Sequence, residues 1–150
     1  MNRTFQSFRN LTHNLADLKA MGSILSWDQE AMMPSKGAAS RARLRATSAA
    51  IYHEKLTDSS LEDLMSQLED SDLEDWQRRS LQEMRREQRK ALRVPRRLVQ
   101  ELAETASTAY EFWVKARNES RFDTFAPWLK KLLDLKREEA RCLELSSSLY

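Results

Sequence analysis

The amino-acid sequence predicts an all-α fold, with about six helices in an antiparallel bundle built from long helical hairpins. Glycine occurs twice and proline three times in 150 residues, so few positions interrupt a helix. Apolar residues recur every three or four positions along most of the chain, and charged residues make up 32% of it. Residues 1–150 are therefore expected to form a single helical domain, long enough to bury a core.

A first helix is expected from about Arg3 to Met21. Apolar residues on one stripe mark it: Phe5, Phe8, Leu11, Leu15 and Leu18. His13 lies off this stripe and is interpreted as a solvated side chain. Gly22 either ends the helix or only loosens it, because apolar residues continue beyond it.

Residues 27–34, with the sequence WDQEAMMP, are expected to connect the first two helices. Proline disfavours helical conformation in the residue before it, so Met33 should be extended or turning. A buried Trp27 would need a partner for its N–H, which Asp28 or Glu30 could supply. Two interpretations stay open: a well-packed connector, or the polar lip of a ligand pocket.

A second helix is expected from Gly37 to Leu56. Its shared face comprises Leu44, Ser48, Ile51, Tyr52 and Lys55, and its alanines at 38, 39, 42, 46, 49 and 50 permit close helix approach. Arg41, Arg43 and Arg45 alternate along it. Side chains two positions apart do not share a helical face, so separate surface arginines are favoured over one compact anion site.

His53-Glu54 raises the question of a zinc-peptidase motif, HExxH. That motif needs a second histidine four residues after the first, so that both imidazoles project from one face of a helix. Thr57 occupies that position, and His13 is the only other histidine in the chain. We therefore predict no metal-binding residue, and also no catalytic or cofactor-binding residue, within residues 1–150.

Two helices are expected to follow, the first of them short, with Thr57, Asp58 and Ser59 as candidate capping groups at its start. Ser59 with Glu62 and Ser71 with Glu74 have the spacing of capping boxes, in which two side chains satisfy free amides at a helix start. The third helix carries Leu61, Leu64, Met65 and Leu68, and the fourth carries Leu73, Trp76, Leu81 and Met84.

The fifth helix should begin with Pro95 in its first turn and end at about Asn118. A last helix follows, capped by Asp123 or Thr124, with Pro127 in its opening turn. Its apolar residues are Phe125, Trp128, Leu129, Leu132, Leu133, Leu135 and Leu143.

Charge is segregated along the middle of the chain. Every charge from residue 58 to residue 75 is acidic, whereas residues 78–97 are basic apart from Glu83 and Glu87. The basic block could bind nucleic acid. It lacks interleaved aromatic residues for base stacking, so an acidic helix folded against a basic one is the favoured explanation. The net charge of +2 gives no global argument for a nucleic acid or membrane partner.

The single cysteine, Cys142, excludes an internal disulfide and a cysteine zinc cluster, which suits a reducing compartment. The N-terminus has no continuous apolar run, so neither a signal peptide nor a transmembrane helix is expected. These features favour a cytoplasmic protein.

Several short motifs, in this order and spacing, together resemble the carboxypeptidase Taq family of metallocarboxypeptidases. They are Trp27-Asp28-Gln29-Glu30, Met33-Pro34, Arg41, His53-Glu54 with Thr57, Val94-Pro95 with Leu98-Val99, Trp113 with Ala116-Arg117, and Phe122 to Phe125 with Pro127 and Leu129. Each motif is weak alone, but together they cover essentially the whole chain.

The resemblance implies a cytosolic, mostly helical, dimeric enzyme that removes C-terminal residues from peptides with broad specificity. It also implies a divalent metal, zinc or cobalt, held by an HExxH helix and a downstream glutamate. Both lie C-terminal to the region matched here, so the chain resembles only the N-terminal part of the family. No catalytic or metal-binding residue carries over, and we expect a truncated, inactive chain whose missing catalytic part is its natural partner.

Two alternatives remain: a stand-alone, self-associating helical interaction module, and a nucleic-acid binder that uses residues 78–97. Without the missing part, apolar residues of the last two helices should be exposed. We expect them to form the interface of a homo-oligomer, most simply a two-fold dimer. The expected members are Trp113, Trp128, Leu132 and Leu133.

Overall fold

The computed structural model describes residues 3–144, with the side chain of Ser35 left out, and confirms the all-α prediction. The α-helices are α1 (Arg3–Ala31), α2 (Ala38–Leu56), α3 (Ser59–Glu69), α4 (Asp75–Arg93), α5 (Arg96–Glu119) and α6 (Ala126–Cys142). Two single-turn 3-10 helices, η1 (Ser35–Gly37) and η2 (Phe122–Thr124), precede α2 and α6. The described residues form no β-strand.

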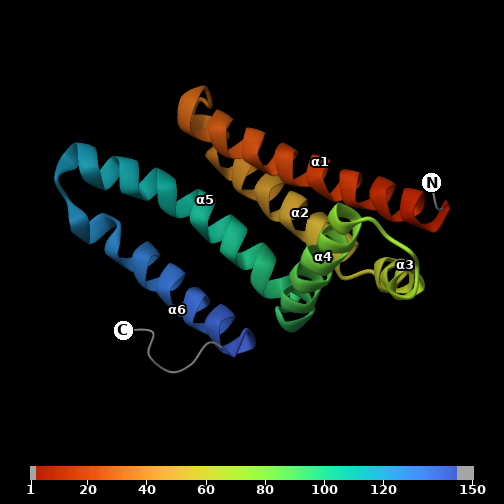
Figure 1. Ribbon diagram of the computed structural model, residues 1–150. Coiled ribbons are helices and arrows are strands. Elements are labelled where there is room, and N and C mark those ends of the chain that lie inside the picture. The colour runs from red at the N-terminus through yellow and green to blue at the C-terminus, as the bar shows by residue number, and fades with distance from the viewer. Residues whose placement is uncertain (1–2, 145–150) are drawn as a thin grey trace.

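Helices α1, α2, α5 and α6 lie side by side in that order, each antiparallel to the next (Figure 1). Helices α3 and α4 pack at one end of this layer, where α3 contacts α1 and α4 contacts α2. The most extensive packing in the fold is between α2 and α5, which are separated in sequence by α3 and α4. The middle of the layer is therefore made by a long-range pair.

Helix α1 is ten residues longer than expected. It continues through Gly22 and ends only at Ala31, so residues 27–31 are its last turns and not a connector. One glycine inside a helix costs only about 1 kcal/mol relative to alanine, which the packing of a 29-residue helix can offset. The helix ends shortly before Pro34. Met33 is non-helical, as expected for a residue that precedes a proline.

The inner face of α2 is made of small residues. Ala42, Ala46 and Ala50 are buried, which confirms that alanines permit close helix approach. The larger residues expected on the packing face are turned outward: Leu44 is 50% exposed and Ile51 is 40% exposed. For Leu44 and Ile51 the prediction is wrong, whereas Tyr52 of the same predicted face is partly buried and packs against the main core.

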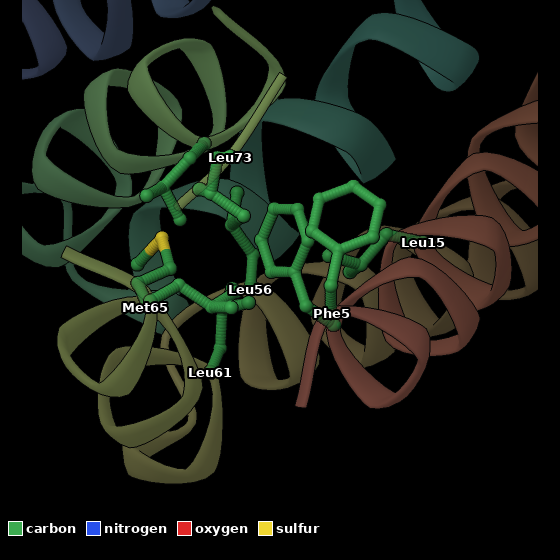
Figure 2. Packing of buried hydrophobic residues seen from close by; sticks show 9 residues of the cluster. Phe5, Leu15, Leu56, Leu61, Met65 and Leu73 are labelled. Atoms are coloured by element: carbon green, nitrogen blue, oxygen red, sulfur yellow. The ribbon is translucent and has the colours of Figure 1, made fainter. Parts of the chain in front are cut away.

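The main core lies where α3 and α4 meet the start of α1 and the end of α2 (Figure 2). Leu61, Met65 and Leu68 of α3 are each 0% exposed, and α1 contributes Phe5 and Phe8, which are 1% exposed. A smaller cluster of Val94, Leu98 and Leu135 joins the start of α5 to α6.

The helix starts agree with the predicted caps only in part. Of the candidate groups Thr57, Asp58 and Ser59, the carboxylate of Asp58 caps α3 by accepting from the Ser60 amide at 2.8 Å, and Ser59 is instead the first helical residue. Helix α4 starts at Asp75, where the side chain of Gln77 accepts from the Glu74 amide at 2.9 Å.

Helix α6 begins after a 3-10 turn that contains both of its predicted caps, Asp123 and Thr124, so its N-cap is Phe125. Pro127 does lie in its first turn, as expected. The N-cap of α4 lies three residues after its predicted cap, Ser71, and that of α6 one or two residues after its own, because neighbouring polar residues compete for the same free amides.

Truncating a core side chain tests this packing. Met65→Ala should lower the free energy of unfolding by about 2–5 kcal/mol, because it leaves a cavity between α3 and its neighbours. Met32→Ala is the matched control, since Met32 is 71% exposed and its loss should change the free energy by less than about 0.5 kcal/mol. Urea denaturation followed by circular dichroism measures both, and equal effects would contradict this core assignment.

Candidate functional site

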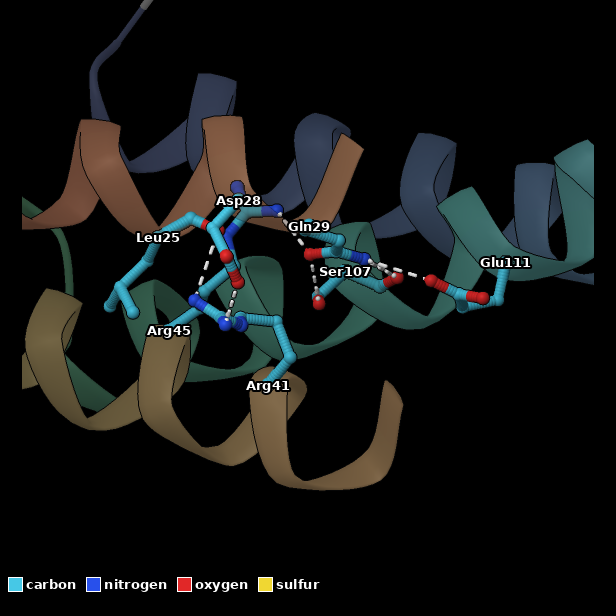
Figure 3. Close-up of polar contacts among 7 residues, drawn as sticks. All are labelled: Leu25, Asp28, Gln29, Arg41, Arg45, Ser107 and Glu111. Atoms are coloured by element: carbon cyan, nitrogen blue, oxygen red, sulfur yellow. Dashed lines mark hydrogen bonds and ion pairs between the residues drawn. The ribbon is translucent and has the colours of Figure 1, made fainter. Parts of the chain in front are cut away.

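A buried amide joins three helices near the end of α1 (Figure 3). Gln29 is 5% exposed, and its Nε2 donates to the carbonyl of Ser107 on α5 at 2.9 Å. Its Oε1 accepts from the Ser107 hydroxyl at 2.7 Å and from Nη1 of Arg45 on α2 at 3.1 Å. Nε2 also lies 3.4 Å from a carboxylate oxygen of Glu111. We call these groups, with Asp28 and Arg41, the polar junction.

The second half of the polar junction is an ion pair between α1 and α2. Arg41 donates to the carboxylate of Asp28 and, through Nη1, to the backbone carbonyl of Leu25 at 3.3 Å. The Arg41 side chain is 15% exposed and that of Asp28 is 32% exposed, so the pair is partly shielded from water. One guanidinium thus holds a side chain and a backbone carbonyl of α1 against α2 (Figure 3).

The charge of Arg45 is balanced less completely than that of Arg41, because no described carboxylate forms an ion pair with it. Burial lowers the pKa of Arg45, and the neighbouring Arg41 acts in the same direction, whereas Glu30 raises it. An arginine still carries its proton at any physiological pH. The charge is therefore held in a partly desolvated place, where its hydrogen-bond partner among the described residues is the neutral amide oxygen of Gln29.

The structure brings together only part of the 27–34 stretch. Trp27 is 63% exposed, so it is not the buried indole that the sequence suggested, and Glu30 also faces outward. Asp28 and Gln29 turn inward instead. The sequence analysis did not identify Gln29 as a buried residue. Its spacing could have indicated this, because Leu15, Gly22 and Gln29 follow one another at intervals of seven residues and so share one face of the long helix.

The arginines of α2 also need a correction. Arg43 is exposed, as predicted, but Arg41 and Arg45 are not separate surface residues. Four positions apart, they share one face of α2 and both turn toward α1.

His53 has a structural task. Its Nε2 lies 2.8 Å from the carbonyl of Val94 and 3.1 Å from that of Ala91, at the C-terminus of α4. When Nε2 carries the proton, it donates to these carbonyls, of which that of Ala91 also accepts from the Val94 amide at 3.0 Å. His53 therefore fixes α2 to the junction between α4 and α5, while His13 is exposed as expected.

Several arginines of the basic block face acidic partners. Arg85 pairs with Glu69 of the acidic segment, as the segregation of charge suggested. Others pair with residues of α2, α5 and the end of α6: Arg93 with Glu144, Arg96 with Glu54, and Arg97 with Glu101 and Glu138. These pairs divide the block among several neighbours.

Among residues 3–144 no three histidine, cysteine, aspartate or glutamate side chains come together as a metal site requires. No helix within the same range is long and apolar enough to cross a membrane. The polar junction has hydrogen-bonding groups but no nucleophile paired with a base, so its geometry suits holding helices in register.

Comparison with known proteins identifies the setting of this junction. A family model for the carboxypeptidase Taq (M32) metallopeptidases matches residues 7–150. The chain belongs to this family. This match confirms the resemblance found in the sequence. The polar junction therefore lies in a segment of a carboxypeptidase Taq protein whose described residues are all-α.

Relatives place this family segment within longer proteins. It is 32% identical over 143 residues to thermostable carboxypeptidase 1 of Thermus thermophilus, covering 93% of this chain and 28% of the relative. The M32 carboxypeptidase structure from Deinococcus radiodurans R1 matches with a TM-score of 0.72 at 30% identity, over 95% of this chain and 29% of that one. The crystal structure of BsuCP matches with a TM-score of 0.92 over 97% of this chain and 30% of that one; its 18% identity shows the fold alone.

The chain thus spans less than a third of these relatives. A metallopeptidase needs protein ligands for its metal, and the described residues of this carboxypeptidase Taq segment provide no fitting set. No metal-dependent step can be derived from its side chains.

Removing the buried amide tests the polar junction. Gln29→Ala should lower the free energy of unfolding by about 1–3 kcal/mol, because Ser107 and Arg45 lose their partner inside the protein. Gln67→Ala, at an exposed position of α3, is the matched control and should change little. In a double-mutant cycle, Gln29→Ala and Ser107→Ala should be coupled by about 0.5 kcal/mol or more. If chemical denaturation shows that the two single-mutant changes in the free energy of unfolding simply add in the double mutant, the two side chains act independently.

Proposed function

We propose that this chain is the N-terminal helical part of a metal-dependent carboxypeptidase that removes C-terminal residues from peptides. The observation that carries the proposal is the family match over residues 7–150, together with coverage of only 28% of the Thermus thermophilus relative. In this proposal the helical layer helps to wall the groove that receives the peptide. The metal and the residues that activate water belong to the part of the enzyme outside these 150 residues.

The shape of the chain supports a role as part of a larger body. Its accessible surface is 10,259 Å². A compact monomer of 17.6 kDa would have about 7,900 Å². A single layer of helices has two broad faces, and large apolar side chains are exposed on α1, α2, η2 and α6: Met21, Ile24, Leu44, Phe122 and Leu133. Such surface is what a missing body of the enzyme would cover.

The polar junction has a clear purpose in this proposal. A wall of a substrate groove must keep its shape, and α1, α2 and α5 are fixed to one another by the hydrogen bonds of Gln29 and the Asp28–Arg41 ion pair. Buried polar groups with satisfied partners define one packing arrangement among those that apolar contacts alone would allow. The junction thus serves to position helices, without touching the reacting atoms.

We further propose that the basic block does not bind nucleic acid, a view supported by the ion pairs of Arg85, Arg93, Arg96 and Arg97. A cytoplasmic location is also proposed. It is supported by the single free cysteine, Cys142, because cytosolic proteins keep their thiols reduced.

The isolated chain should be inactive. With zinc or cobalt added, it should release no C-terminal amino acid from N-blocked dipeptides, because the 150 residues contain only His13 and His53 and no HExxH pair. Metal-dependent release that exceeds a mock purification would defeat this expectation.

A chimaera supplies the positive arm of the test. When residues 7–150 replace the matching segment of the Thermus thermophilus carboxypeptidase, the hybrid should fold and hydrolyse the same peptides. A chimaera that folds, binds its metal and is inactive would favour the alternative of a stand-alone interaction module.

The isolated chain should also self-associate, most simply as a two-fold dimer through α5 and α6. Trp113 is 38% exposed and Leu133 is 46% exposed. Trp128 stacks on Phe112, with their ring centroids 4.8 Å apart, and is therefore partly covered. Burial of such side chains contributes about 1.5–3 kcal/mol each, so a few suffice for association. Sedimentation velocity at micromolar concentration should find a dimer, and Leu133→Glu should shift it toward monomer. A wild-type monomer there would contradict this interface.

A further inference from the structure

A cavity of about 290 Å³ lies where α1, α2 and α5 meet, one helical turn from the polar junction. Helix α1 contributes Lys19, Gly22 and Ser26 to its lining, and α2 contributes Arg45 and Ser48. Ala103 represents α5. We call it the three-helix cavity. It shares Arg45 with the polar junction but contains none of the groups that join Gln29 to α5.

The lining of the three-helix cavity is cationic and rich in donors. Lys19 and Arg45 bring two positive charges, and its described lining includes no acidic side chain. The hydroxyls of Ser26 and Ser48 make no hydrogen bond to any described residue, so both are free to donate into the cavity. Tyr52 also lines it, but its hydroxyl is engaged by Glu87 of α4.

Arg45 is the group that most needs a ligand here. It is half-buried, yet it forms no ion pair with a described carboxylate, unlike Arg41, which pairs with Asp28. Glu30 attracts it only from beyond ion-pair distance, and Arg41 repels it. One nitrogen, Nη1, donates to Gln29, while Nε and Nη2 make no bond within residues 3–144. A partly desolvated cation with free donors is stabilised by an anion.

Gly22 gives an independent indication that this space is kept open. It lies in the middle of α1, where glycine costs about 1 kcal/mol relative to alanine. Packing does not require it: a Cβ at this position would stand 3.9 Å from the Ser48 hydroxyl oxygen, an ordinary contact. The added methyl group would instead project beside Ser48 in the cavity lining. The absent side chain thus leaves room for something other than protein.

We propose that the three-helix cavity is a binding site for a small oxyanion, either inorganic phosphate or a short carboxylate. Its oxygens would accept from the free nitrogens of Arg45 and from the hydroxyls of Ser26 and Ser48, with Lys19 adding charge. Guanidinium and hydroxyl donors together match an anion with two or more oxygens. The bound anion would neutralise Arg45 and add one more connection between α1 and α2, so occupancy would stabilise the layer.

Isothermal titration of the folded chain with sodium phosphate and, separately, sodium acetate tests the proposal, with sodium chloride at equal ionic strength as reference. Saturable binding of one probe identifies the anion class, and binding of both identifies a general oxyanion site. Neither probe binding above the chloride reference would overturn the proposal.

Two variants locate the site. Arg45→Met should weaken binding about ten-fold or more, because it removes the charged donors. Its matched control is Arg43→Met, which removes an exposed arginine of the same helix and should leave affinity unchanged. If both arginine variants bind like the wild type, the anion binds elsewhere and the proposal fails.

Arg45→Met also removes a partner of Gln29, so Gly22→Ala is the variant that separates binding from folding. It should raise the melting temperature of the anion-free chain, since alanine favours the helix, and still weaken anion binding by narrowing the cavity. A Gly22→Ala protein with a higher melting temperature and unchanged affinity would show that the cavity is not the site.

Discussion

The close contact between α2 and α5 is the constraint on which the rest of this structure depends. Buried small residues line both helices, with Ala42, Ala46 and Ala50 on α2 and Ser107 and Ala109 on α5. Small side chains let helix axes approach closely, and only at short range do polar groups of neighbouring helices reach one another. Once α2 and α5 are so close, α1 must pack along one side and α6 along the other (Figure 1). The layer follows from that order.

The polar junction and the three-helix cavity are two consequences of the same approach. Where α1 reaches α5 across α2, Gln29 fills the space and satisfies Ser107 and Arg45 (Figure 3). About two turns away along α1, Gly22 leaves a gap instead, and Arg45 borders it. The same guanidinium therefore serves as a structural donor on one side and as an unpaired cation on the other. An anion in the gap would complete what the protein leaves unsatisfied.

A single layer of helices exposes more surface than a compact isolated domain does, but it suits a part of a larger enzyme that covers its faces. The end where α3 and α4 pack is well filled, as the core around Met65 shows, whereas exposed side chains such as Ile24 and Leu44 lie elsewhere on the layer. Relatives more than three times as long retain the same arrangement. This supports the proposal that the layer is completed by the catalytic body of a carboxypeptidase, with the polar junction keeping its helices in place.

The sequence by itself determined the helical class, the six helical segments and the family. Periodicity and scarce Gly and Pro act locally, and Pro34 and Pro95 mark helix boundaries through backbone geometry alone. It did not determine which face of each helix is buried. Leu44 and Trp27 are exposed while Gln29 and three alanines of α2 (Ala42, Ala46 and Ala50) are buried, because burial depends on which helix lies opposite. Only the tertiary structure placed α5 against α2, and with it the partners of Gln29 and the unpaired charge of Arg45, since 78 residues separate Gln29 from Ser107 along the chain.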